Sequence, residues 1–146
     1  MKFTCSVEID QPIKRVIQLF DNPANMKEWQ DGFVSMELLS GVRGKVGAKS
    51  RLLYKSGKHV VELIETIQVK NLPQEKTALY EHKHMVNIMS NYFTALGTDK
   101  TKWEVVIEYT KFIGFFPKLM ALLMPGVFKK QTQKWLDQFK KFAETK

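Results

Sequence analysis

Three histidines are the residues whose types and spacing come nearest to a metal site. His82 and His84 lie on one face of an expected strand, and His59 could face them across the sheet, a spacing seen in some strand-borne zinc sites. Zinc needs its third ligand from a neighbouring strand and hydrogen-bonded neighbours that fix the imidazole tautomers, and the sequence establishes neither. We therefore expect no metal and interpret these histidines as solvent-facing or core residues.

Glu65 is the one candidate catalytic residue. Alternation along its strand places it on the apolar face, with Val61, Leu63, Ile67 and Val69. A carboxyl group buried on that face could act as a general acid or base. The interpretation we favour is that Glu65 points outwards, either because a bulge rotates it or because the polar face of the strand is wrongly assigned.

Other nucleophiles and loops offer less chemistry. Cys5 has no neighbouring histidine or helix N-terminus, so we expect a small core residue. Gly41, Gly44 and Gly47 alternate with basic residues as in a phosphate-binding loop, but a strand rather than a helix follows them. No Ser-His-Asp or Cys-His arrangement can be assembled from the spacing. The sequence therefore implies no cofactor.

The elements that position these residues begin with a strand and two short helices. Phe3, Cys5, Val7 and Ile9 alternate with polar residues, which is typical of a half-buried strand. Asp10 is the expected N-cap of a first helix, which carries apolar residues at helical spacing from position 13 to 20. The sequence 21–23, Asp-Asn-Pro, repeats the cap signal before a second helix with Met26 and Trp29 on one side.

A run of strands follows. Segments rich in Val, Ile, Leu, Thr and Tyr, separated by turn signals, predict strands at 33–40, 48–55, 58–70, 76–84, 86–96 and 101–111. No clear turn residue separates the fourth and fifth of these segments. Consecutive strands with tight turns predict an antiparallel meander.

The most apolar part of the chain is 112–128, which is apolar on every side. Such a segment must be buried or must face ligand or lipid. It is shorter than the roughly 20 residues of a membrane span and contains Pro117, Lys118 and Pro125. We expect it to form the front of the last helix, to bury one side against the sheet, and to act as a lid hinged near Pro125 and Gly126.

The tail after this segment is basic and amphipathic. Phe128, Thr132, Trp135, Phe139 and Phe142 form one stripe at helical spacing, which predicts packing on the sheet with lysines opposite. Of the net charge of +8, residues 110–146 contribute +6, from eight lysines and two acids. A solvated helix face or attraction to anionic lipid could explain this concentration of positive charge. Nucleic-acid binding is not expected, because the aromatic residues lie on the side of the helix opposite the lysines.

Composition sets the broad class. Hydrophobic residues make up 44% and charged residues 26% of 146, as in ordinary globular proteins. The single cysteine excludes an intramolecular disulfide and favours a reducing, cytoplasmic setting.

Short motifs connect the chain to a known family. They are Phe20-Asp21-Asn22-Pro23 to Trp29, Met36-Glu37-Leu38-Leu39-Ser40-Gly41 with Val46-Gly47, and Thr101-Lys102-Trp103. With the element order, they resemble the SRPBCC or START-like (Bet v-like) superfamily, and most closely its polyketide cyclase/dehydrase-type branch. The resemblance covers essentially the whole chain.

The resemblance implies one START-like domain over residues 1–146 with an α+β helix-grip fold. In this fold a curved seven-stranded antiparallel sheet wraps around a long C-terminal helix, with two short helices between strands 1 and 2. A hydrophobic cavity lies between sheet and helix. Members include lipid carriers, steroid and quinone binders, and aromatic-ring cyclases.

We expect this cavity to be the ligand site. Its predicted lining residues are Met36, Leu52, Tyr54, Leu63, Ile67, Tyr92, Phe93, Trp103, Val105, Tyr109, Leu119 and Leu123. Tyrosine hydroxyl groups among them would orient an otherwise apolar ligand.

Three classes of function follow. The first is non-catalytic binding or transport of a hydrophobic small molecule or lipid, with transient membrane contact through Phe115, Phe116, Leu119 and Leu123. The alternative is a cyclase or dehydrase that acts on an aromatic or polyketide-like substrate in the same cavity. The third is a protein-interaction or chaperone-assisting module that places 112–128 in an interface. Monomer and homodimer both remain open.

Overall fold

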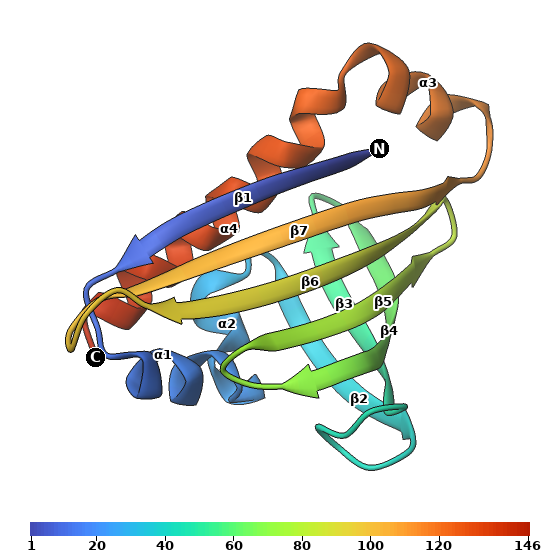
Figure 1. The fold of residues 1–146 in the computed structure, drawn as a ribbon. Coiled ribbons are helices and arrows are strands. Elements are labelled where there is room, and N and C mark those ends of the chain that lie inside the picture. Colours follow the sequence, from blue (N-terminus) through green and yellow to red (C-terminus); the bar gives the residue numbers. More distant parts are fainter.

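The strands of the chain form one antiparallel sheet with seven members (Figure 1), and the computed structural model describes all residues from 1 to 146. The strands are β1 (Lys2–Ile9), β2 (Phe33–Ser40), β3 (Lys49–Ser56), β4 (His59–Asn71), β5 (Glu75–His82), β6 (Met85–Ala95) and β7 (Thr101–Phe112). Their order is β1-β7-β6-β5-β4-β3-β2, so β2 to β7 form the predicted meander. β1 then adds to the free edge of β7.

The strand boundaries follow the apolar alternation closely. Where the sequence lacks a turn residue, between β5 and β6, the turn is Lys83-His84. There the backbone N–H of His84 donates to Nδ1 of His82 at 3.1 Å. A side chain thus supplies the acceptor for this turn, where no glycine or proline marks it.

The short helices α1 (Ile13–Phe20) and α2 (Met26–Trp29) come between β1 and β2, with a 3₁₀ turn at Pro23–Asn25. The expected cap of this turn is confirmed, because Oδ1 of Asn22 accepts from the Ala24 N–H at 3.0 Å. The expected cap of α1 is wrong. Pro12 occupies that position, and the Asp10 backbone N–H instead donates to Glu144 at 2.7 Å.

The long helix α4 (Pro125–Glu144) lies along β1 (Figure 1). Side chains at its exposed edges fasten it there. Gln133 donates to the Ser6 carbonyl at 3.0 Å, and Lys140 donates to the Glu8 carbonyl at 2.7 Å. Because these bonds hold α4 toward one edge of the sheet, the concave face of the remaining strands is only partly covered.

Aromatic rings fill one end of the space between the sheet and α4. Trp103 stacks on Phe93 with ring centroids 5.7 Å apart, and Phe139 of α4 meets Trp103 edge to face at 5.1 Å. Trp29 of α2 packs against Phe139 at 5.2 Å. Cys5 is buried in the same core, as predicted, and this burial raises the pKa of its thiol.

The apolar segment before α4 forms a separate helix, α3 (Phe115–Leu123). Met124, with φ −135° and ψ 55°, separates the two helices, and Pro125 is the first residue of α4. The predicted break is therefore confirmed, since proline lacks the N–H that a continuous helix would use.

The expected burial of this segment against the sheet is wrong. No residue of α3 is buried, and Phe115 and Leu122 are 81% and 77% exposed. In Figure 1 α3 stands at the upper right, beyond the end of β7. None of the helices is both long enough and apolar enough to span a lipid bilayer.

Candidate functional site: a cavity between the sheet and the long helix

A cavity of about 760 Å³ lies between the concave face of the sheet and the first half of α4. It begins where the aromatic core ends, so Trp29, Trp103 and Leu136 belong to both. Clefts of this size are typical of sites for small molecules. The space exists because a curved sheet has more inner surface than one helix held at its edge can cover.

Most of the predicted lining residues on the strands face this cavity. They are Met36, Leu52, Tyr54, Leu63, Ile67, Trp103 and Tyr109. All of them occupy inward positions of the strand alternation, which explains why the sequence could identify them.

Other predicted lining residues lie elsewhere. Tyr92 is on the outer face of β6, because its neighbours Asn91 and Phe93 both point inwards. Phe93 and Val105 face inwards but are packed in the aromatic core beside the cavity.

Leu119 and Leu123 were expected in the cavity as part of the lid, and this is also not observed. Both belong to α3, which lines no part of the cavity. From the predicted lid, Val127 and Phe128 reach the cavity, and both belong to the first turn of α4.

Several lining residues were not predicted. Phe20, Trp29, Phe128 and Trp135 contribute aromatic surface, and Met89 and Ile107 contribute apolar strand positions. The helical spacing of Phe128 and Trp135 predicted packing on the sheet. It could not show that the sheet curves away beneath them.

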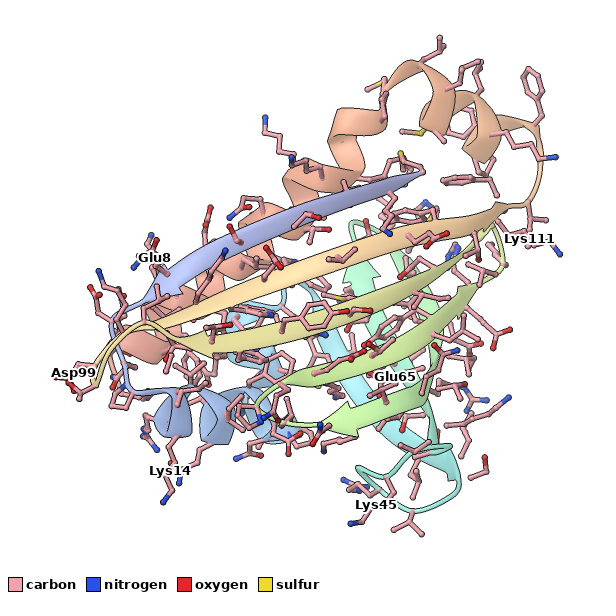
Figure 2. The ribbon with its side chains drawn as sticks, viewed as in Figure 1. Glu8, Lys14, Lys45, Glu65, Asp99 and Lys111 are labelled. Carbon is pink, nitrogen blue, oxygen red and sulfur yellow. The ribbon has the colours of Figure 1, made fainter.

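Glu65 is buried in the cavity wall with 4% of its surface exposed. The outward orientation favoured from the sequence is therefore wrong. β4 does contain a bulge against β5, but it falls between Ile67 and Val69, beyond Glu65. The bulge instead leaves Val69, expected inside, exposed. In Figure 2 Glu65 lies within the sheet, whereas Lys14, Lys45 and Lys111 project from the periphery.

Tyr80 is the hydrogen-bond partner of Glu65. The two residues are directly opposed on β5 and β4, and the Tyr80 hydroxyl donates to Oε2 of Glu65 at 2.7 Å. Burial, and then the charge of Glu65, raise the pKa of Tyr80 well above its usual value. The second oxygen of Glu65, Oε1, is buried and has no protein partner.

The other cavity tyrosines are also neutral at ordinary pH. Tyr54 donates to Oε1 of Gln30 at 2.7 Å and stacks on Trp135, with ring centroids 5.6 Å apart. Burial, and then the charge of Glu65, raise the pKa of Tyr54, while burial raises the pKa of Tyr109 to about 12. These hydroxyl groups can therefore donate and accept hydrogen bonds but do not act as bases.

Comparison with known proteins gives the fold. No protein-family model matches the chain, and no curated protein matches its sequence. A conserved protein from Geobacillus kaustophilus is similar, with a TM-score of 0.80 and 14% identity over 99% of this chain and 96% of that one. The ZhuI aromatase/cyclase from Streptomyces sp. R1128 has a TM-score of 0.77 and 11% identity over 99% of this chain and 93% of that one. Ara h 8.0201 has a TM-score of 0.75 and 10% identity over 100% of this chain and 99% of that one.

The chain has a helix-grip fold, as these structures do. The sheet, the paired short helices and the long last helix agree with the architecture expected from the sequence motifs. In this helix-grip arrangement the cavity occupies the space between the concave face of the sheet and α4.

One end of the helix-grip cavity is basic. Arg43 and Lys45 come from the β2–β3 loop, and Lys70 and Lys76 come from β4 and β5. Lys70 pairs with Asp21 at 2.9 Å, and Lys76 lies 5.7 Å from the centre of the Phe20 ring. The basic loop predicted from the sequence therefore lies at the end of the cavity.

The histidines are outside the helix-grip cavity. The rings of His82 and His84 lie 5.4 Å apart at the β5–β6 turn. Burial, and then the nearby His84 and Lys83, lower the pKa of His82. No three His, Cys, Asp or Glu side chains come close enough together to hold a metal ion.

Proposed function

We propose that the protein binds a hydrophobic small molecule or lipid in the cavity between the sheet and α4, without catalysing a reaction. The observation that carries this proposal is the cavity itself, about 760 Å³ in volume and lined mainly by apolar and aromatic side chains. A folded protein would ordinarily fill such a space with its own side chains.

Binding energy would come chiefly from apolar contact. Burial of apolar surface contributes roughly 25 cal/mol per Å². A few polar side chains then fix the orientation of the ligand. Tyr54, Tyr109 and Glu65 are placed for this second role.

Native mass spectrometry of the purified protein tests the proposal. We expect a second population, heavier by the mass of a lipophile that organic solvent removes. The emptied protein should then rebind apolar probes, which Trp29, Trp103 and Trp135 would report through their fluorescence because all three line the cavity. A single population that binds no apolar probe would contradict the proposal.

We further infer that α3 touches anionic membranes during loading or release. Phe115, Phe116, Leu122 and Leu123 form its exposed apolar surface. Residues 109–130 contain four lysines and no Asp or Glu, so the surroundings of α3 would be attracted to anionic head groups. If α3 instead joins two copies of the chain, light scattering would show a dimer. If α3 binds another protein rather than a membrane, the protein would fail to bind vesicles.

A cyclase- or dehydrase-type reaction is the second candidate function. It requires an ionisable side chain within the cavity, and the burial of Glu65 there favours it. One of the similar structures is an aromatase/cyclase. Conversion of a polyketide-like substrate that is lost in Glu65→Gln would support catalysis, whereas unchanged recovery of the bound molecule supports simple binding.

A further inference from the structure

A band of polar side chains crosses the inner face of the sheet. Ser50 of β3 opposes Glu65 of β4, which opposes Tyr80 of β5, and Tyr80 in turn opposes Asn87 of β6, which opposes Tyr109 of β7. All of these residues line the cavity. The strand register thus places a serine, a carboxylate, two phenols and an amide in one row.

Apolar rows flank this band. On one side Ile67, Ala78, Met89 and Ile107 are aligned across β4 to β7, and on the other side Leu52 opposes Leu63. A ligand in the cavity would therefore meet hydrocarbon on both sides of a narrow polar strip.

Glu65 is the residue in this strip that has a buried polar atom without a hydrogen-bond partner. Its Oε2 accepts from Tyr80, but Oε1 is buried without a protein donor. No lysine, arginine or histidine forms an ion pair with Glu65. Of the basic residues at the end of the cavity, Lys70 pairs with Asp21 and Lys76 lies over the Phe20 ring. A buried carboxylate oxygen left without a donor is costly, so a donor on the ligand would recover that energy.

We propose that Oε1 of Glu65 accepts a hydrogen bond from the ligand, so that the cavity selects lipophiles carrying a hydroxyl or ammonium group over plain hydrocarbons and ethers. This inference rests on the proposed function, because it requires a ligand in the cavity. It specifies the chemistry of that ligand: an apolar body with one hydrogen-bond donor positioned along it.

Three probes with the same alkyl chain test the selection. Decanol and decylamine carry a donor, whereas decyl methyl ether has only an acceptor, and none absorbs where tryptophan does. Binding is followed by the fluorescence of Trp29, Trp103 and Trp135. We expect decanol and decylamine to bind at least about tenfold more tightly than the ether, as expected for a hydrogen bond to a charged group.

Two cavity variants and one control separate the role of Glu65 from effects on folding. Glu65→Gln keeps the size of the side chain. We expect it to lower the affinity for decanol and decylamine by about tenfold and to leave the affinity for the ether unchanged. Tyr80→Phe frees Oε2 and should keep the preference for donors. Glu62→Gln makes the same change on the outer, exposed face of β4 and should alter nothing.

Equal affinity of the three probes for the unmodified protein would overturn the inference and leave the proposed function intact. The inference is likewise overturned if Glu65→Gln weakens all probes alike, or if Tyr80→Phe removes the preference. If no probe binds, the ether included, the proposed function itself fails, and this inference fails with it.

Discussion

The indole N–H of Trp103 donates to Oδ1 of Asn91 at 3.1 Å, on neighbouring strands β7 and β6. Both side chains are buried, and the amide of Asn91 also donates to the Lys76 carbonyl at 3.2 Å. This bond satisfies the polar atom of a fully buried tryptophan at the boundary between the aromatic core and the cavity.

Asn91→Leu should therefore destabilise the protein. It leaves the Trp103 N–H and the Lys76 carbonyl without their partner, and one buried unpaired group costs about 1 to 3 kcal/mol. Urea unfolding would measure this as a lower midpoint with an unchanged slope. Gln68→Leu, the same amide-to-leucine change at an exposed position of β4, is the matched control. Wild-type stability in Asn91→Leu would show that the hydrogen bond is energetically unimportant.

Filling the cavity should abolish binding without loss of stability. Leu63→Trp places a large ring in the space beneath α4, where about 760 Å³ is available. We expect apolar probes to lose most of their affinity while the unfolding midpoint stays close to that of the unmodified protein. Calorimetry with a probe, together with thermal unfolding, gives both quantities.

The neighbouring substitution Ile64→Trp provides the comparison. Ile64 lies on the opposite face of the same strand and does not line the cavity. Equal loss of binding in the two variants would mean that the ligand site is not this cavity.

Stability should decline in alkali because the cavity tyrosines are neutral when folded. Tyr109 has a folded pKa of about 12 against an ordinary value of 10, and the pKa of Tyr54 is also raised. A raised folded pKa means that the unfolded chain loses its proton first. The contribution of these neutral tyrosines to the free energy of unfolding is thus complete below pH 10 and is lost as pH rises toward 12.

Urea unfolding between these pH values would show this decline. Tyr109→Phe should make it shallower, since one of the ionising groups has been removed. An equally steep decline in Tyr109→Phe would contradict the assignment of the raised pKa to Tyr109.

Membrane contact through α3 should depend on the lysines around it. Lys134 is left out of the test because it is paired with Asp31 at 2.8 Å. Lys129→Glu with Lys130→Glu should weaken binding to phosphatidylserine vesicles by more than tenfold, since each lysine near an anionic surface contributes about 1 kcal/mol. Vesicle sedimentation would measure the change.

Lys14→Glu with Lys27→Glu is the control of equal charge, on α1 and α2 rather than beside α3. It should leave vesicle binding nearly unchanged. If both pairs weaken binding equally, net charge alone would explain it and α3 would have no special role.

Local patterns in the sequence predicted the fold well. Period-two alternation set each strand within narrow limits, and the family motifs indicated how sheet and helix would combine. The motifs were sufficient because they mark the short helices and the strand ends that define this architecture.

The site was less predictable because it depends on pairing and packing. Glu65 and Tyr80 become neighbours only through the register of β4 and β5, and the bulge that was expected to rotate Glu65 lies beyond it, between Ile67 and Val69. The misplaced Tyr92 has a different cause. Adjacent residues on one strand cannot both face inwards, so the inward position of Phe93 already excluded Tyr92. For α3, apolarity on all sides gave no information about which side packs.

The bonds that hold α4 to β1 also bear on how the protein folds. Gln11 donates to the Ala143 carbonyl at 2.9 Å across a separation of 132 residues, and Gln133 and Lys140 make similarly distant bonds to β1. The meander from β2 to β7 joins strands that are neighbours along the chain and needs no such closure. Because distant contacts cost more chain entropy than local ones, the cavity should be among the last parts of the molecule to form, after the sheet that makes its floor.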